Sequence, residues 1–121
     1  ELLPLLRTSM EDHDETARAL GCACMKGALE ALPGALGAEP VRVLYPEMLK
    51  RLDDSSDEVR VLACSTMRAF LRAAPTDCFR GTTVEYMLDT LFVHLDDGNP
   101  EVQEAVRDVI VDAGRGVDAE A

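Results

Sequence analysis

One combination of residues occurs twice in this chain at a fixed separation of 42 positions. A proline is followed by an aspartate and then by an arginine at identical spacings; the residues are Pro4, Asp12 and Arg18, then Pro46, Asp54 and Arg60. Flanking apolar residues repeat at the same distance, as Met25 and Met67 do. A repeat of this length made of two helical patterns is typical of α-solenoids, in which each repeat packs against its neighbours. The sequence therefore predicts an all-α solenoid.

Six helical segments are expected, and no strand. Apolar residues recur every three to four positions, the helical period, over residues 2–10, 14–32, 41–52, 57–73, 82–95 and 100–113. Short acidic turns join the helices of a pair, which predicts three antiparallel pairs with repeats at about 1–32, 40–73 and 82–113. We expect Gly114 to end the last helix and residues 114–121 to form a disordered tail. Because the chain begins with Glu1, we interpret it as a fragment of a longer solenoid.

Two further expectations concern the packing of the second helix and the shape of the helices that contain proline. In the second helix, the stripe that we expect to face the core consists of Ala17, Leu20, Gly21, Cys24 and Ala28. Proline removes a backbone hydrogen-bond donor and bends a helix. We therefore predict helix kinks at the equivalent residues Pro4 and Pro46.

The composition limits the classes of partner. The formal net charge is −11, and 47% of the residues are hydrophobic, as in a soluble globular domain. The phosphates of a nucleic acid would repel a chain of this charge, and an anionic membrane surface would do so more weakly. No apolar run approaches the roughly 20 residues that a membrane-spanning helix needs. The sequence therefore favours proteins as partners, with neither nucleic acid nor membrane.

The cysteines and histidines indicate neither a metal site nor a catalytic site. Cys22 and Cys24 would point roughly 200° apart on a helix, and no histidine lies at zinc-finger spacing from them. We interpret these residues, with Cys64 and Cys78, as core or half-buried free thiols, which favour a reducing compartment such as the cytosol. No histidine is spaced from a nucleophile as a catalytic triad requires, so we expect no enzyme activity and no cofactor.

The repeated proline, aspartate and arginine, with the helical stripes, resemble the HEAT repeat over residues 2–113. The stretch 44–54, Leu-Tyr-Pro-Glu-Met-Leu-Lys-Arg-Leu-Asp-Asp, and the Asp-Glu-Val-Arg at 57–60 are close to the HEAT consensus. The third repeat departs from it, with Asp89 in place of proline and Gln103 in place of arginine.

The HEAT resemblance implies a ladder of polar contacts between repeats, made of Asp12, Arg18, Asp54 and Arg60. In such stacks the turn aspartate caps the following helix and accepts a hydrogen bond from the arginine. We therefore expect Asp54 to cap the helix that contains Arg60, and Arg60 to reach Asp54 and the Asp12 of the preceding repeat. With Gln103 in place of arginine, the ladder would stop at the third repeat, as suits a terminal repeat.

The acidic turns are one candidate partner-binding surface. Stacked turns would align carboxylates, including those of Asp53, Asp96 and Asp97, along a ridge that attracts a basic segment of a partner. Helix capping at a solvated edge is the alternative. Calcium binding at residues 53–58 is disfavoured, because the twelve-residue loop pattern and its central glycine are absent.

The second helices of the pairs would form the inner wall of the stack and supply another candidate surface. Lys26 and Arg68 are equivalent there, and Arg72 lies one turn beyond Arg68. These basic residues would receive an acidic or helical segment of a partner. The alternative is a solvated helix face.

A narrower resemblance concerns function. Residues 44–54 and residues 86–97, Tyr-Met-Leu-Asp-Thr-Leu-Phe-Val-His-Leu-Asp-Asp, look like the C-terminal repeats of the HEAT class of axonemal dynein assembly factors. This resemblance implies a non-catalytic scaffold for cytoplasmic preassembly of dynein arms, with dynein chains, chaperones or other assembly factors as partners. A generic HEAT adaptor, such as a transport receptor or a phosphatase scaffold, is the alternative. A HEAT-like DNA-processing enzyme is a third hypothesis, which the net charge of −11 opposes.

Overall fold

Helices make up most of the described chain. The computed structural model describes residues 2–32, 36–74 and 82–120. The helices are α1 (Leu2–Ser9), α2 (Glu15–Glu30), α3 (Ala38–Lys50), α4 (Asp57–Ala73), α5 (Thr82–Val93) and α6 (Pro100–Glu120), and the short 3₁₀ turns η1 (Arg51–Asp53) and η3 (His94–Asp96) follow α3 and α5. No strand occurs within these ranges. The prediction of an all-α fold is confirmed.

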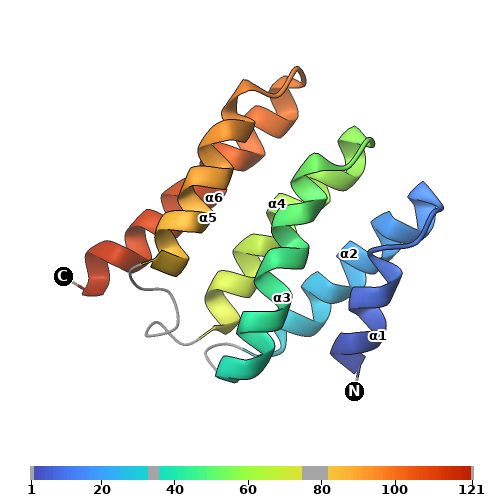
Figure 1. The fold of residues 1–121 in the computed structure, drawn as a ribbon, viewed down its shortest axis with the longest axis horizontal. Coiled ribbons are helices and arrows are strands. Elements are labelled where there is room, and N and C mark those ends of the chain that lie inside the picture. Colours follow the sequence, from blue (N-terminus) through green and yellow to red (C-terminus); the bar gives the residue numbers. More distant parts are fainter. Residues whose placement is uncertain (1, 33–35, 75–81, 121) are drawn as a thin grey trace.

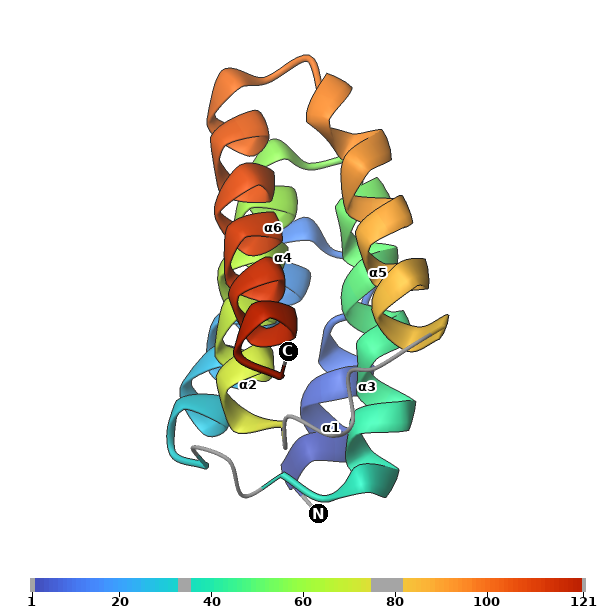
Figure 2. The same ribbon diagram turned by 90° about the vertical axis from the view of Figure 1, so that its left-hand side faces the viewer.

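The helices form three antiparallel pairs that stand side by side in chain order (Figure 1). Turned by 90°, the structure shows α1, α3 and α5 in one layer and α2, α4 and α6 in the other (Figure 2). Within the second layer α4 contacts α2 on one side and α6 on the other. The turns within the three pairs lie at the same end of the stack (Figure 1). This is the stacked arrangement of an α-solenoid, in which each pair contacts its neighbours in sequence.

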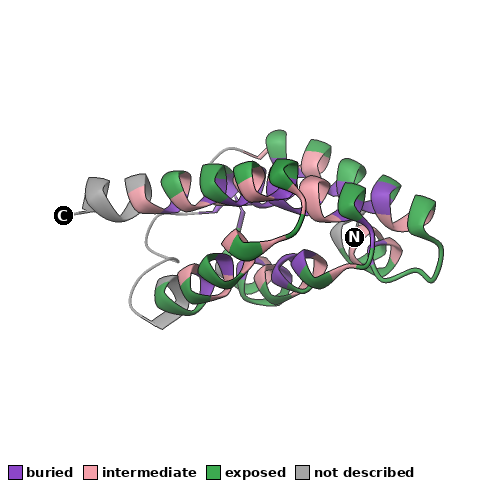
Figure 3. Ribbon diagram, turned by 90° about the horizontal axis from the view of Figure 1, so that it is seen from above, coloured by how far each residue is buried: buried purple, intermediate pink, exposed green. Residues whose placement is uncertain are grey.

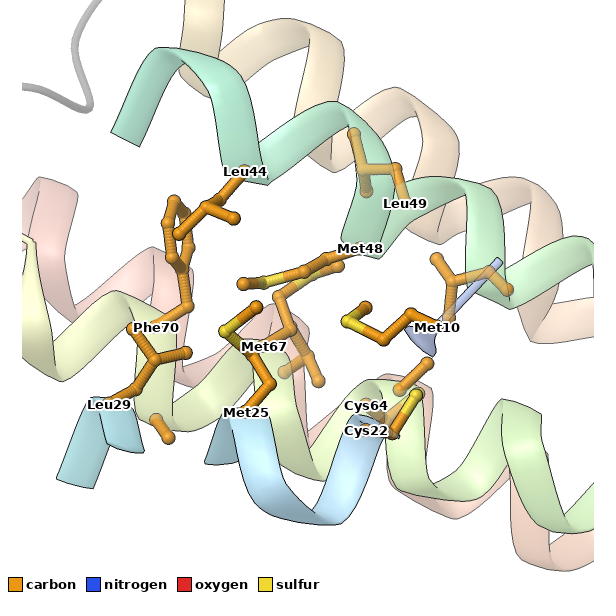
Figure 4. Close-up of a cluster of buried hydrophobic side chains, with 14 of the residues drawn as sticks. Met10, Cys22, Met25, Leu29, Leu44, Met48, Leu49, Cys64, Met67 and Phe70 are labelled. Carbon is orange, nitrogen blue, oxygen red and sulfur yellow. The ribbon is translucent and has the colours of Figure 1, made fainter. Parts of the chain in front are cut away.

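The core lies between the two layers and is rich in aliphatic and sulfur-containing side chains. Buried residues gather on the helix sides that face the opposite layer (Figure 3). Met25 of α2, Met48 of α3 and Met67 of α4 are at most 1% exposed and lie close together (Figure 4). Methionine is unbranched and flexible, so it fills the irregular space between helices in a chain that has no tryptophan.

The core-facing stripe predicted for α2 is wrong in register. The buried residues of α2 are Ala19, Gly21, Cys22, Met25 and Leu29. Of the predicted stripe, only Gly21 is fully buried; Leu20 is 61% exposed and Cys24 is also exposed. The helix therefore has two apolar faces, of which one packs on the core and the other is uncovered.

The end predicted for the last helix is also wrong. α6 continues through Gly114 to Glu120, where we expected a disordered tail. The extension contains two glycines, Gly114 and Gly116, and each glycine inside a helix costs only about 1 kcal/mol relative to alanine. The helix therefore tolerates Gly114 and gains almost two further turns.

The predicted helix kinks stay predictions. Pro46 lies inside α3, which is continuous from Ala38 to Lys50. Pro4 lies in the first turn of α1, where the described helix has no earlier turn to bend. The connections predicted around residues 33–34 and 75–81, with Cys78, lie outside the described residues.

Candidate protein-binding surface

Each turn within a helix pair carries two consecutive acidic residues. They are Glu11 and Asp12, Asp53 and Asp54, and Asp96 and Asp97. In the second and third turns the second acid is buried, with side chains 3% exposed for Asp54 and 7% for Asp97. The first acid is exposed in every turn. The two acids therefore have separate roles, one inside the stack and one on its surface.

The buried acid is held by an arginine from the preceding repeat. Arg18 donates from Nε to Asp54 Oδ2 at 2.8 Å and from Nη2 to Asp54 Oδ1 at 3.0 Å. Arg60 repeats this arrangement on Asp97, at 2.8 Å and 3.2 Å. Two parallel hydrogen bonds between opposite charges fix both distance and orientation. Each pair therefore sets the position of one repeat on the next.

Each arginine also binds the backbone of its own turn. Arg18 Nη1 donates to the carbonyl oxygen of Asp12 at 3.1 Å, and Arg60 Nη1 donates to that of Asp54 at 2.8 Å. In the third repeat, Gln103 Nε2 donates to the carbonyl oxygen of Asp97 instead. Glutamine thus keeps the contact within its own repeat but carries no charge toward a following one.

The predicted direction of the ladder is wrong. We expected Arg60 to bind the carboxylate of its own turn and to reach back to Asp12. Instead its side-chain partner across repeats is Asp97 of the following turn, and it reaches Asp54 only through the backbone carbonyl. The structure does bring Arg18 and Asp54 together.

The capping role predicted for Asp54 belongs to Ser56. Ser56 is the N-cap of α4, and its Oγ accepts a hydrogen bond from the Val59 N–H at 3.3 Å. The Asp54 carboxylate accepts the Ser56 N–H at 2.9 Å. Asp54 therefore stabilises the turn that precedes the N-cap residue, rather than capping the helix itself.

A second set of contacts runs in the opposite direction between the same turns. Ser56 Oγ donates to Glu15 Oε2 of the preceding repeat at 2.8 Å. Asn99 Nδ2 donates to Asp57 Oδ2 at 3.0 Å. Glu15 and Asp57 are 42 positions apart, so the repeat spacing could have revealed them. The ladder prediction did not include this contact, and sequence reasoning missed it.

The ladder carboxylates are stabilised in their charged form. Burial alone would raise the pKa of Asp54, but the hydrogen bonds from Arg18 and from the Ser56 N–H outweigh it and hold the pKa below its ordinary value of 3.8. For Asp97, burial is likewise outweighed by the Asn99 N–H and by Arg60, and the pKa is lowered. Both groups are therefore charged partners of arginine at neutral pH.

The first acids of the three turns, Glu11, Asp53 and Asp96, form an exposed row that we call the acidic ridge. The Asp53 side chain is 79% exposed, and its Oδ1 lies 3.3 Å from Nε2 of His94. Among the described residues, no lysine or arginine forms an ion pair with a ridge carboxylate. Asp97, which we predicted as part of this surface, belongs to the ladder instead. The ridge is thus a repeated negative surface whose charges the ladder does not use.

Part of the basic group predicted on the inner wall is paired with an acidic residue of α6. Arg68 Nε donates to Asp112 Oδ2 at 2.7 Å, and Arg72 Nη2 lies 3.9 Å from the same oxygen. Lys26 is half-buried, and the described residues give it no ion pair. Asp112 has no acidic counterpart in the second repeat, so the repeat pattern could not reveal it. The Asp112 carboxylate of α6 therefore offsets one of the three positive charges that we expected on this wall.

A small groove lies beside these pairs. It has a volume of about 190 Å³ and is lined by Val61, Cys64, Ser65, Arg68, Ala105 and Asp108. Its lining includes one basic residue, one acidic residue and four uncharged residues. The groove therefore favours no particular class of ligand.

Two of the cysteines are buried in the core as unreactive thiols. Burial raises the pKa of Cys22 to about 11 and that of Cys64 to about 12. Thiolate is the reactive form of cysteine, so these two residues are inert at neutral pH. Cys24, which we placed on the core stripe, is exposed.

Within the described ranges, no set of three or more His, Cys, Asp or Glu side chains is arranged to hold a metal ion. None of the helices described has both the length and the apolarity needed to cross a membrane.

Comparison with known proteins gives two consistent findings. Residues 1–120 match a protein-family model described as stalled ribosome sensor GCN1-like, HEAT repeats. Similar curated proteins are dynein axonemal assembly factor 5 of Homo sapiens, 33% identical over 112 residues, of Xenopus laevis, 34% over 113 residues, and of Mus musculus, 30% over 112 residues. Each alignment covers 90% of this chain, and the chain spans 13% of the length of each relative.

Proposed function

Because this chain belongs to the family of GCN1-like HEAT repeats, we propose that it is a non-catalytic, protein-binding segment of a scaffold. The name of these relatives, dynein axonemal assembly factor 5, supports a role in the assembly of axonemal dynein. The work of such a scaffold would be preassembly of dynein arms in the cytoplasm. Its partners would be dynein chains, chaperones or other assembly factors.

The acidic ridge is the observation that carries this proposal. Glu11, Asp53 and Asp96 recur at the same place in three successive turns, and each is exposed. The neighbouring acids, Asp54 and Asp97, already hold the repeats together. A row of exposed like charges along one edge attracts a partner of opposite charge and orients its approach. The surface therefore fits a lysine- or arginine-rich segment of a client protein.

Two other functions predict different partners. A generic HEAT adaptor, such as a transport receptor or a phosphatase scaffold, would bind its clients equally well in cells with and without cilia. A DNA-processing enzyme would need a basic inner wall. Asp112 pairs there with Arg68 and lies near Arg72, and the net charge is −11, so this function is disfavoured. The same charge argues against binding to an RNA backbone.

The ridge can be tested with two variants of equal charge. The ridge variant carries Glu11→Gln, Asp53→Asn and Asp96→Asn, and the control carries Glu30→Gln, Glu85→Gln and Asp89→Asn, three exposed acids away from the ridge. Tagged chains are used as bait in extracts of ciliated and unciliated cells, and dynein chains and chaperones are quantified by mass spectrometry. Circular dichroism and thermal melting check that both variants are folded.

We expect the wild type and the control to recover dynein chains or chaperones from ciliated cells, and the ridge variant to recover at least about fivefold less, since each lost charge weakens steering and contact. Equal recovery by both variants would exclude the ridge as the binding surface. Equal recovery of the same partners from both cell types would favour the generic adaptor over dynein assembly.

A further inference from the structure

The turn between η1 and α4 contains two adjacent serines whose hydroxyls have opposite surroundings. Ser56 is 8% exposed, and its Oγ donates to Glu15 Oε2 at 2.8 Å and accepts the Val59 N–H at 3.3 Å. Ser55 is exposed, and its hydroxyl makes no hydrogen bond among the described residues. Ser56 is therefore part of the contact between repeats, whereas the Ser55 hydroxyl is accessible to a modifying enzyme.

The side chain at position 55 is not needed to form the turn. The equivalent residues are His13 in the first turn and Gly98 in the third, so the three turns carry three unrelated side chains at this place. A Cβ atom on Gly98 would meet nothing within 4 Å. A side chain at this position of the turn therefore extends into open space, and a larger group fits there without displacing the ladder.

The residues on either side of Ser55 have extended backbone. Asp54 has φ −62° and ψ 145°, and Ser56 has φ −93° and ψ 126°. In a protein kinase the substrate hydroxyl must reach both the catalytic aspartate and the γ-phosphate of ATP, in line with the bond that breaks. An extended segment allows this approach better than a helix does, so the turn presents Ser55 in a suitable form.

Exposed acids lie on both sides of Ser55 in the sequence. The Asp53 side chain, two residues before, is 79% exposed, and the Asp57 side chain, two residues after, is 60% exposed. Glu58, three residues after, is also exposed. Kinases select substrates in part by the pattern of charge around the target. These carboxylates favour an enzyme with a basic substrate cleft and would repel one with an acidic cleft.

A second serine is followed by acids at the same spacing but has different surroundings. Ser9 precedes Glu11 by two residues and Asp12 by three. It is the last residue of α1, it is half-buried, and its Oγ donates to the Leu5 carbonyl oxygen at 3.2 Å. Helical backbone and an engaged hydroxyl both oppose phosphoryl transfer. The sequence pattern alone does not separate these two serines, but the structure favours Ser55.

We propose that Ser55 is a phosphorylation site for an acid-directed serine kinase, and that the phosphate strengthens binding of a basic partner to the acidic ridge. In the transfer, Ser55 Oγ forms a bond to the γ-phosphorus of ATP while the bond from this phosphorus to the β–γ bridging oxygen breaks. ADP leaves, and the hydroxyl proton passes to the catalytic aspartate of the kinase. The second part rests on the proposed function, because it requires a basic client on the ridge.

The phosphate would add charge to the middle of the ridge. Phosphoserine carries about −1.5 to −2 charges at neutral pH, more than one carboxylate supplies. Ser55 lies in the same turn as Asp53 and directly before Ser56, the N-cap of α4. Negative charge at the N-terminus of a helix is favourable. The fold therefore accommodates the modification, while the attraction for a segment rich in lysine or arginine increases.

The modification is tested by incubating the intact chain with ATP and casein kinase II, an acid-directed serine kinase. Mass spectrometry counts the phosphates and peptide mapping locates them. We expect one phosphate, on Ser55, and incorporation at least about tenfold slower in Ser55→Ala. The matched control Ser9→Ala should be phosphorylated as fast as the wild type. Absence of phosphorylation, preferential labelling of Ser9 or Ser56, or an unchanged rate in Ser55→Ala would overturn the proposal.

The effect on the fold is tested by thermal melting before and after phosphorylation. We expect the same midpoint within about 5 °C, because the side chain at this position extends into open space. A larger decrease would overturn the proposal, since the phosphate would then disrupt the turn and the ladder.

The effect on the ridge is measured with a fluorescein-labelled octalysine peptide as the probe, by fluorescence anisotropy. Phosphorylation should lower its Kd about threefold or more, and phosphatase treatment should restore the original value. An unchanged Kd after complete phosphorylation of Ser55 would overturn the second part of the proposal. The unmodified ridge variant tests the proposed function separately. Equal Kd values for it and the unmodified wild type would exclude the ridge, whereas the mass spectra decide the modification in either case.

Discussion

Gly21 of α2 lies so close to the end of α1 that a Cβ atom on it would stand 2.9 Å from the backbone nitrogen of Met10. The same Cβ would lie 3.0 Å from two atoms of Ser9. Both distances are shorter than ordinary van der Waals contact, and two of the three neighbouring atoms belong to the backbone, which cannot rotate away. The absence of a side chain at position 21 is therefore what lets the first two helices approach each other.

Gly21→Ala should destabilise the chain by about 1–3 kcal/mol, the usual cost of overpacking. Gly27→Ala in the same helix is the matched control, because its Cβ would meet nothing within 4 Å. That change should stabilise the chain by up to about 1 kcal/mol, since alanine is the better helix former. Urea denaturation followed by circular dichroism measures both. Equal effects in the two variants would show that α1 can move away at little cost.

Arg60→Ala should lower the free energy of unfolding by about 2 kcal/mol, between the values for exposed and fully buried ion pairs. The reason is that Asp97 would stay buried without its partner. Arg42→Ala is the control, because within the described part of the chain Arg42 pairs with Glu39 alone, on the surface, and both side chains are about 70% exposed. Arg51 would be a poor control, since its Nη1 donates to the Met10 carbonyl oxygen at 2.7 Å. Similar denaturation midpoints for the two variants would contradict a stabilising ladder.

Acid should unfold the chain by protonating the ladder. The pKa values of Asp54 and Asp97 are lowered in the folded state, so their contribution to stability is complete above the ordinary value of 3.8. It is lost as the pH falls below about 4 through the folded-state values. We expect the denaturation midpoint to drop over this range in the wild type. The drop should be smaller in Arg60→Ala, where Asp97 has no arginine. Parallel curves for the two proteins would disprove the assignment.

Protonation of Glu47 should stabilise the chain, whereas protonation of the ladder aspartates destabilises it, and it should occur at a higher pH. Burial and the neighbouring carboxylate of Glu11 raise its pKa above the ordinary value of 4.5. The folded state therefore binds this proton more tightly, and stability increases as the pH falls from the raised pKa toward 4.5. Glu47→Gln should stabilise the chain at neutral pH by roughly 0.5 kcal/mol, the scale of a partly exposed charge pair. The gain should disappear below about pH 4.5, and a gain independent of pH would indicate a packing effect instead.

The helices could be predicted well because the repeat fixes them twice. The predicted segment 57–73 has the same bounds as α4, and a second copy of its pattern lies 42 residues before it. The direction of the ladder could not be predicted, because the sequence is equally compatible with Arg60 binding the preceding turn or the following turn. Only the relative placement of successive pairs decides in favour of Asp97.

The error in α2 has a physical cause. Leu20 and Cys24 follow the helical period as well as Cys22 and Met25 do, so the helix has two overlapping apolar stripes. Periodicity reports that a face is apolar, not whether it meets the core or another repeat. Similarly, the charge of Arg68 suggested an open basic surface, and only the fold shows that Asp112 lies against it.

The buried arginine–aspartate forks are confined to the edge of the stack that contains the turns. Arg18 with Asp54 and Arg60 with Asp97 join successive pairs there, while the Arg68 pair, further along the helices, is 37% exposed at the arginine. The helix pairs are therefore fixed to one another mainly at the turn end of the stack. Under a pulling load or around a bulky cargo, the pairs should separate at the opposite end while the turn end keeps its spacing, so bending of the stack would be confined to one plane.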